Sequence, residues 1–283
     1  MGSLRSYIVS SLQTERGQGA NPCPLAALRG GWELVQETVA LNGDELPNFS
    51  IPHGRQHWKH QVRLSGHLYA ALAEEKCLQA GVQLRYYETP VTASFGNGQW
   101  TVKTMGKGTE TEIVCNQLID CTGNAFVANL AGYDRLRESV IQPGTLQFLL
   151  GGYDFESLDL KKLEALYEEE LKKGKLLKKE FRSIVSLLKG RGDNIQHVFG
   201  ADSTTSETHT VANIDGRTSL LKMFRFLRTL PGLENIKLLD MQTETAVRET
   251  YRIDGLYKIT ETDYVTGKLF DDAVSYSYYP IDV

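Results

Sequence analysis

The chain has 283 residues, of which 41% are hydrophobic and 23% are charged, and its formal net charge is -4. These values are typical of a soluble globular protein with a sizeable core. They argue against a nucleic-acid-binding protein, which usually carries a basic face. No apolar run reaches the ~20 residues of a membrane span, and the N-terminus lacks the apolar run of a signal peptide, so we expect a cytoplasmic protein.

The cysteine and histidine patterns do not favour a metal site. The chain has four cysteines, and none of them forms a C-x-x-C pair: Cys23, Cys77, Cys115 and Cys121. This spacing favours reduced thiols over a disulfide framework or an iron–sulfur site. His53, His57 and His60 lie close together in sequence, but they lack acidic or cysteine partners at a usual spacing. We therefore expect no metal site.

The first third of the chain contains one clear helical pattern. Residues 1–30 show little periodicity and are expected to be irregular. Leucines then recur every four residues from about Gln61 onward, which predicts an amphipathic helix. Gly81 suits a left-handed C-terminal cap of this helix. Alternating apolar and polar residues predict a strand over 82–89.

Short strands separated by glycine-containing turns follow. They are predicted at 92–95, 99–105 and 109–115. Turns this closely spaced indicate an antiparallel meander, because parallel strands need long crossovers. A brief apolar strand over 118–121 then ends at Thr122 and Gly123, and residues 124–132 have a helical pattern with a closing glycine.

The second half mixes strands with charged helices. Amphipathic helices are predicted near 157–173, 176–189 and 206–229, and strands near 144–154, 197–200, 236–241, 245–253 and 256–259. Asp254 and Gly255 are expected to form a hairpin turn between the last two strands. Thr260 precedes Asp263 by three residues, which predicts a capping box at the start of a short helix.

The order of elements over residues 61–132 suits a dinucleotide cofactor. A helix, a strand, a meander and a second strand lead to a Thr-Gly turn and another helix. Glycine at position 123 would allow close backbone approach, and the helix after it is expected to offer free N–H groups to an anion. Residues 55–91, 118–132 and 247–282 are similar to segments of the FAD-dependent oxidoreductase family, which has a glutathione-reductase-like flavoprotein fold and includes proteins like heterodisulfide reductase.

The resemblance implies a mixed α/β architecture. A partial FAD/NAD(P)-binding domain would contain the antiparallel meander, with a mixed α/β substrate domain inserted into it. The expected boundaries are 1–30 for an irregular segment, 31–143 for the partial FAD-binding domain, 144–245 for the inserted substrate domain, and 246–283 for C-terminal strands and a short helix.

The resemblance also implies two sets of site residues. The residues expected to contact the cofactor are Val91, Thr122, Gly123 and Asn124. The candidate catalytic residues on the substrate side are His209, Arg217, Arg248 and Arg252. The arginines would hold an anionic substrate or stabilise negative charge on reduced flavin, and the histidine would transfer a proton. The same residues also fit structural roles, as ion pairs with neighbouring acidic residues and as a helix-entry histidine.

One expected motif is missing from the sequence. The chain has no G-x-G-x-x-G run, which is the loop that binds the pyrophosphate in this fold. The nearest candidate, residues 17–22, lacks the third glycine, and Pro24 opposes a normal helix there. Family members also continue beyond the Tyr-Pro-Ile-Asp segment that precedes Val283. We therefore expect a fragment truncated at both ends that binds FAD weakly.

The leading hypothesis is part of an FAD-dependent oxidoreductase that transfers a hydride between flavin and a small-molecule substrate. The electron partner is not encoded in a recognisable motif. Relatives use an iron–sulfur cluster in some cases, but no ligand motif for one is present here. Two alternatives stay open: a non-catalytic scaffold or binding protein that has lost the cofactor site, and a non-redox enzyme that uses His209 and the arginines directly.

Overall fold

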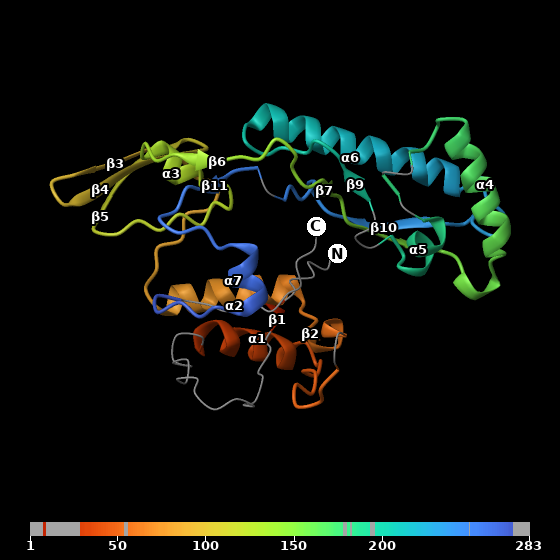
Figure 1. Cartoon of the computed structure of the whole chain (residues 1–283), viewed down its shortest axis with the longest axis horizontal. Helices are drawn as coiled ribbons and strands as arrows, with labels where there is room; N and C mark the ends of the chain where they lie inside the picture. Colours follow the sequence, from red (N-terminus) through yellow and green to blue (C-terminus); the bar gives the residue numbers. More distant parts are fainter. Residues whose placement is uncertain are drawn as a thin grey trace. The chain divides into compact units, whose positions relative to one another are not determined.

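The structure is a computed structural model, and it describes residues 8–9, 29–53, 56–177, 180–181, 183–192, 196–248 and 250–273. The candidate loop at 17–22, Pro24, Cys23 and the Tyr-Pro-Ile-Asp segment lie outside the described residues. The chain divides into two compact units. Unit 1 contains Tyr87–Lys258, and unit 2 contains Ser3–Tyr86 and Ile259–Val283. Helices and antiparallel strands occur together, so the predicted mixed α/β class is confirmed (Figure 1).

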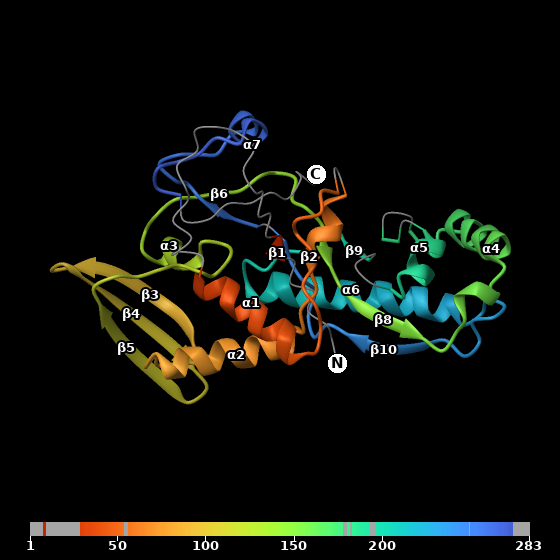
Figure 2. The same cartoon turned by 90° about the horizontal axis from the view of Figure 1, so that it is seen from below.

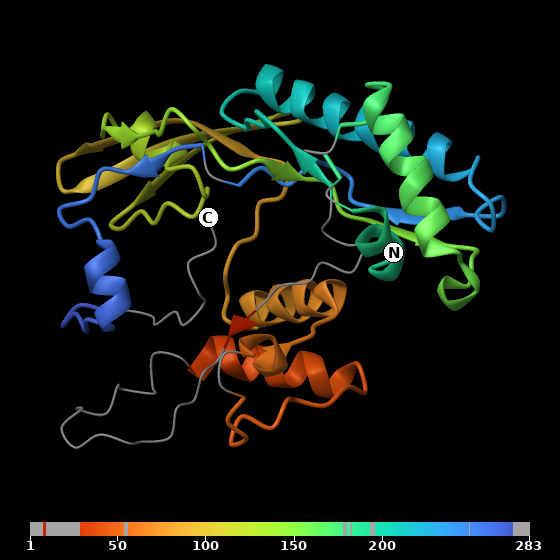
Figure 3. The ribbon, with the colours of Figure 1, turned by 45° about the vertical axis from the view of Figure 1, so that its right-hand side comes forward.

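Unit 2 is built on two packed helices. Helix α1 (Arg29–Leu41) contacts α2 (Gly66–Gln79), as Figure 3 shows. Strand β1 (Ile8–Val9) pairs antiparallel with β2 (Gln61–Val62), which the short helix η2 (His57–His60) precedes. Val35, Val39, Val62 and Leu64 form a buried apolar cluster in this unit. Helix α1 was not predicted from the sequence.

Two sequence expectations for unit 2 hold. Gly81, directly after the C-cap of α2, has φ +75°, which is the predicted left-handed conformation. Helix α7 (Glu261–Thr266) begins with the predicted capping box, in which Thr260 and Asp263 bond reciprocally to each other's backbone N–H. Helix α2, however, starts at Gly66 rather than near Gln61, because the Ser65 hydroxyl caps it by accepting from the N–H of Leu68.

The strand predicted over 82–89 is wrong. Residues 82–88 form no strand, and Val82 is 47% and Tyr87 95% exposed. The alternating pattern is present, but a strand also needs a hydrogen-bonded neighbour, and no described strand pairs with this segment. Tyr87 instead adopts φ +62°, which is not a strand conformation, just before the meander begins.

The antiparallel meander of unit 1 is confirmed. Its strands, side by side in Figure 2, are β3 (Thr89–Gly96), β4 (Gln99–Gly106) and β5 (Thr109–Cys115), paired in the order β3-β4-β5. The first hairpin turns at Asn97 and Gly98, which both have positive φ, as a two-residue turn requires. Helix α3 (Phe126–Leu130) packs against β3.

The second half of unit 1 is organised around an interrupted strand. Strand β8 (Phe148–Gly151) pairs with β10 (Lys237–Met241), and β7 (Gly144–Thr145) pairs with β9 (His197–Val198). Thr145 also bridges to Ala246, so the segment from β7 to β8 has antiparallel partners along its length. The strands predicted at 144–154, 197–200 and 236–241 are therefore present in shortened form.

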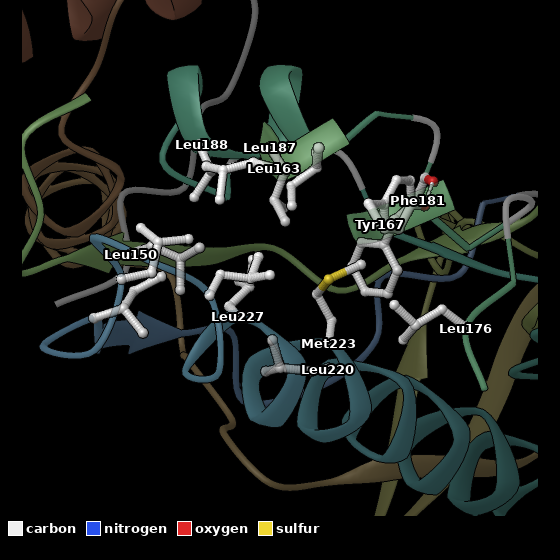
Figure 4. Close-up of a cluster of buried hydrophobic side chains, with 14 of the residues drawn as sticks. Leu150, Leu163, Tyr167, Leu176, Phe181, Leu187, Leu188, Leu220, Met223 and Leu227 are labelled. Carbon is white, nitrogen blue, oxygen red and sulfur yellow. Dashed lines mark hydrogen bonds between the residues drawn. The ribbon is translucent and has the colours of Figure 1, made fainter. Parts of the chain in front are cut away.

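Helices cover these strands and enclose the largest core. They are η3 (Phe155–Ser157), α4 (Leu160–Lys172), α5 (Ile184–Lys189) and α6 (Ser206–Leu227). Figure 4 shows the apolar side chains that meet between them, among which are Leu150, Leu163, Tyr167, Phe181, Leu187, Met223 and Leu227. The buried Tyr167 hydroxyl donates to the carbonyl of Phe181. None of the described helices is long and apolar enough to cross a membrane.

Three further strand predictions need correction. Residues 118–121 form no strand, and Ile119 is 80% exposed. Of the strand expected at 245–253, only the bridge at Ala246 and the strand β11 (Arg252–Ile253) form. Strand β11 pairs with β6 (Arg135–Leu136), not with 256–259, so Asp254 and Gly255 do not connect a hairpin. In each case the local pattern is compatible with a strand, but the partner is decided elsewhere in the chain.

Candidate functional site

The turn at Thr122 and Gly123, here called the corner, is held in place by Asp120. The Oδ1 atom of Asp120 accepts hydrogen bonds from the N–H of Thr122 at 2.9 Å and from its hydroxyl at 2.6 Å. The Oδ2 atom accepts from the N–H of Ala128 at 2.9 Å. Burial would raise the pKa of the Asp120 carboxyl, but these hydrogen bonds outweigh it and hold the pKa below its usual value.

The same contacts correct the expectation that α3 offers free N–H groups to an anion. The N–H of Phe126 donates to the Thr122 hydroxyl at 2.9 Å, and the N–H of Ala128 donates to Asp120 at 2.9 Å. The start of α3 is therefore already capped by side chains of its own segment. A carboxylate in this position would also repel a phosphate.

Gly123 leaves the corner open on one side, whereas the side-chain oxygen of the adjacent Asn124 is buried. Gly123 has φ +81°, and a Cβ added to it would meet nothing within 4 Å. Glycine is thus needed for the backbone conformation, and the adjacent space is accessible to a ligand. The side-chain Oδ1 of Asn124 is buried without a hydrogen-bond partner among the described residues, which is unusual for a buried acceptor.

The strand that carries Val91 lies against the helix that follows this corner. Val127 of α3 packs in one cluster with Ala93 of β3 and Val102 of β4. Val91 lies at a register irregularity between Pro90 and Thr92 and is 40% exposed. Pairing irregularities of this kind re-aim the backbone groups of a strand. The elements carrying all four proposed cofactor contacts therefore belong to one packed assembly of unit 1.

An arginine–tyrosine cluster beside the corner was missed by the sequence analysis. The guanidinium carbon of Arg135 lies 4.1 Å from the ring centroid of Tyr251, and that of Arg137 lies 5.1 Å from it. Arg135 also donates to the main-chain carbonyl of Asn124 at 3.2 Å, which ties the cluster to the corner. Its Nε atom is buried without a described partner. The spacing of Arg135 and Arg137, two residues apart, was the only local signal, because side chains two apart point the same way in an extended segment.

Arg137 links this cluster to the start of α6. Its guanidinium forms an ion pair with Asp202 at 2.7 Å, and Asp202 also accepts from the N–H of Thr204 at 2.7 Å. Hydrogen bonds to Asp202 and Tyr251 raise the pKa of Arg137. Burial would raise the pKa of Asp202, but its bonds to Thr204 and Arg137 hold it below its usual value. The pair is partly shielded from water, since Asp202 is 14% exposed.

The proposed catalytic arginines near the C-terminal segment have different surroundings. Arg252 of β11 forms an ion pair with Glu138, and this hydrogen bond lowers the pKa of Glu138. Because β11 pairs with β6, Arg252 belongs to the same strand pair as Arg135. Arg248 is exposed.

His209 and Arg217 lie on α6 and contact a separate loop. The Nε2 atom of His209 is 3.5 Å from the Oε2 atom of Glu244. Arg217 donates to the main-chain carbonyl of Thr243. The contacts of Arg252, His209 and Arg217 thus fall in two places, β6–β11 and the loop beside α6, and each contact seen there is also explained by local structure.

A half-open groove of about 470 Å³ lies between α4 and α6, away from all of these residues. Apolar and charged side chains line it, including Leu166, Glu170, Lys173, Lys222, Arg225 and Phe226. Lys173 is already paired with Glu169 at 2.8 Å and with Glu170 at 2.9 Å. The groove contains none of the predicted site residues, so its size alone does not mark it as the place of the chemistry.

The described residues fit part of an FAD molecule. The open side of Gly123 suits close backbone approach of a cofactor, whereas the occupied amides of α3 do not suit its pyrophosphate, and the Asn124 oxygen is buried away from any approaching ligand. No group of three His, Cys, Asp or Glu side chains within the described ranges could hold a metal ion. An iron–sulfur cluster therefore has no support from these residues.

Residues 26–283 match the model of a protein family described as FAD dependent oxidoreductase. No curated protein and no solved structure matches the chain. The family match spans both units and includes every proposed site residue.

Proposed function

Because the chain belongs to the FAD-dependent oxidoreductase family, we propose that it supplies the Thr122–Gly123 corner of a flavin site at which a small-molecule substrate is oxidised or reduced. The observation that carries this proposal is the packing of the Asp120-held corner, through α3, against the strand of Val91. The electron partner is left open, since nothing in the site selects one.

The chain's own contribution at this corner is to position the cofactor. Gly123 lets a ligand approach the backbone closely, and Asn124 would reach the cofactor only after a change of rotamer, because its side-chain oxygen is buried. Val91 would add a main-chain contact at the irregular point of β3. FAD, when bound, supplies the hydride transfer itself.

The arginines would act on the substrate side. Arg248 is exposed, and a guanidinium stays charged at any working pH and binds carboxylates in a fork. Arg252 would have to exchange Glu138 for the substrate, and Arg217 would have to leave its backbone acceptor. His209 is the proposed proton donor or acceptor, and Glu244 would orient its ring. An anionic small molecule suits this set best.

We further propose that this chain by itself binds FAD weakly. A charge-assisted hydrogen bond is worth ~1.5–3 kcal/mol. A chain without a G-x-G-x-x-G loop lacks about three such bonds to the pyrophosphate. Their absence would weaken the binding free energy of FAD by ~5–9 kcal/mol, which is a factor of thousands in affinity. The capped start of α3 supports this, because it offers no replacement donors. The same observation favours the second candidate, a scaffold that keeps the fold without the cofactor.

A titration of the purified chain with FAD separates these possibilities. The matched variants are Gly123→Ala and Gly132→Ala, since both glycines have positive φ and open surroundings but only Gly123 lies at the corner. We expect weak binding that Gly123→Ala reduces further and Gly132→Ala leaves unchanged. Equal effects of the two variants would refute the corner contact. Tight stoichiometric binding would refute the weak-binding proposal, and no binding at all would favour the scaffold.

A further inference from the structure

The solvent-facing side of α6 carries a regular apolar stripe. Val211, Ile214 and Leu221 are 56%, 57% and 47% exposed, although α6 already buries its opposite side in the core. Together with Glu207, Thr218 and Arg225 they follow alternating steps of four and three residues along the helix. This spacing is the a/d pattern of a helix that packs against another helix along a narrow seam.

The stripe is symmetric about the level of Gly216. Ile214 and Thr218 lie at equal sequence distances from it, as do Val211 and Leu221, and so do the oppositely charged Glu207 and Arg225. At 1.5 Å per residue the two charges stand about 27 Å apart along the axis. Two copies of α6 placed antiparallel would therefore bring Glu207 of each copy to Arg225 of the other, with the apolar residues between them.

We infer that this face of α6 is a self-association surface, on which a second copy of the chain docks antiparallel. The charge pattern selects this occupant, because a parallel copy would place Glu207 against Glu207 and Arg225 against Arg225. A two-fold contact is also the commonest way in which identical chains assemble.

The charges at the ends of α6 also stabilise the helix itself, but this effect does not account for the exposed apolar residues between them. Glu207 in the first turn and Arg225 in the last turn complement the helix dipole. The dipole, however, does not require exposed valine, isoleucine and leucine on the line that joins the two charges. A single helix pair is small for a stable interface, so we expect a weak dimer that dissociates on dilution.

Sedimentation velocity over a concentration series tests the inference. We expect a monomer–dimer equilibrium for the unmodified chain. Ile214→Asp should make association at least about tenfold weaker, because it places a charge in the middle of the seam. The charge variants Glu207→Arg and Arg225→Glu should each associate less than the unmodified chain, since each creates two like-charge contacts.

An equimolar mixture of these two charge variants gives the sharpest readout. In an antiparallel heterodimer both end contacts again join opposite charges, so the mixture should associate as the unmodified chain does. This recovery also shows that both variants are folded. Glu110→Arg is the control, because it reverses a charge on an exposed position of β5 and not on α6. A chain that stays monomeric at ~100 µM, or a mixture that fails to recover association, would overturn the inference.

Discussion

Replacing Asp120 by alanine tests whether its carboxylate shapes the proposed cofactor corner. The side chain accepts from the N–H and hydroxyl of Thr122 and from the N–H of Ala128. Alanine removes all three hydrogen bonds at once. The first amides of α3 would then depend on water or on Thr122 alone.

The size of the effect follows from these contacts. Each hydrogen bond to a charged group is worth ~1.5–3 kcal/mol, but part of this side chain is open to water, which replaces some of the loss. Loss of a helix N-terminal cap costs ~0.5–2 kcal/mol in other proteins. We therefore expect Asp120→Ala to lower the free energy of unfolding by about 2 kcal/mol, which is a fall in melting temperature of roughly 4–8 °C.

Urea unfolding at pH 7 measures this change, with Asp134→Ala as the control. Asp134 is an exposed aspartate just after α3, and its replacement should change the free energy of unfolding by less than about 0.5 kcal/mol. Because the pKa of Asp120 is lowered in the folded chain, its contribution is present above the unfolded pKa of about 3.9. It is lost as the pH falls through the lower folded value.

The difference between the unmodified chain and Asp120→Ala should accordingly shrink below about pH 4. If Asp120→Ala unfolds at the same urea concentration as Asp134→Ala at pH 7, the carboxylate does not hold the corner. The reasoning about the occupied amides of α3 would then be wrong, and the corner would again be open to a phosphate.

Two further predictions concern unit 1. In a double-mutant cycle, Arg137→Met and Asp202→Asn should show a coupling of about 1 kcal/mol in the free energy of unfolding, because their ion pair is partly shielded; additive losses would contradict the contact. Burial raises the pKa of Tyr167 to about 12, so an ultraviolet titration should show one tyrosine that ionises late, and Tyr167→Phe should remove that step. The stabilisation by Tyr167 should be complete below about pH 10 and lost as the pH rises towards 12. Tyr167→Phe should lower the free energy of unfolding by about 1–3 kcal/mol, because the Phe181 carbonyl loses its donor. An unchanged titration curve for Tyr167→Phe would count against this assignment.

Elements with local signals were predictable. The Asn97–Gly98 turn fixes the first hairpin of the meander, because both positions need positive φ. Helix α6 was placed within two residues of its observed end, since its apolar period and the following Pro231 are both local features. The strand at 82–89 failed for the opposite reason: its alternation is local, but the partner it needs is not.

The residues of the candidate site likewise fall into those with a local sequence signal and those that depend on a distant partner. Thr122, Gly123 and Asn124 stand in one short motif, so the sequence identified them together. The Arg135–Tyr251 contact and the Arg252–Glu138 pair join segments more than a hundred residues apart, the latter 114 positions. No spacing in the sequence brings such residues together, which is why Arg135, Arg137 and Tyr251 were missed.

The sequence by itself determined the mixed α/β class, the meander, the amphipathic helices and the resemblance to the flavoprotein family. The spacing of apolar residues, the residue types that form turns and the short motifs can all be recognised within a few consecutive residues. Only the tertiary structure decided which predicted strands find partners, which arginines form ion pairs, and that Asp120 accepts from an amide of α3 that was expected to be free for an anion. Those outcomes depend on which groups meet after the chain has folded, and hydrogen-bonding groups that lose water must find a partner there.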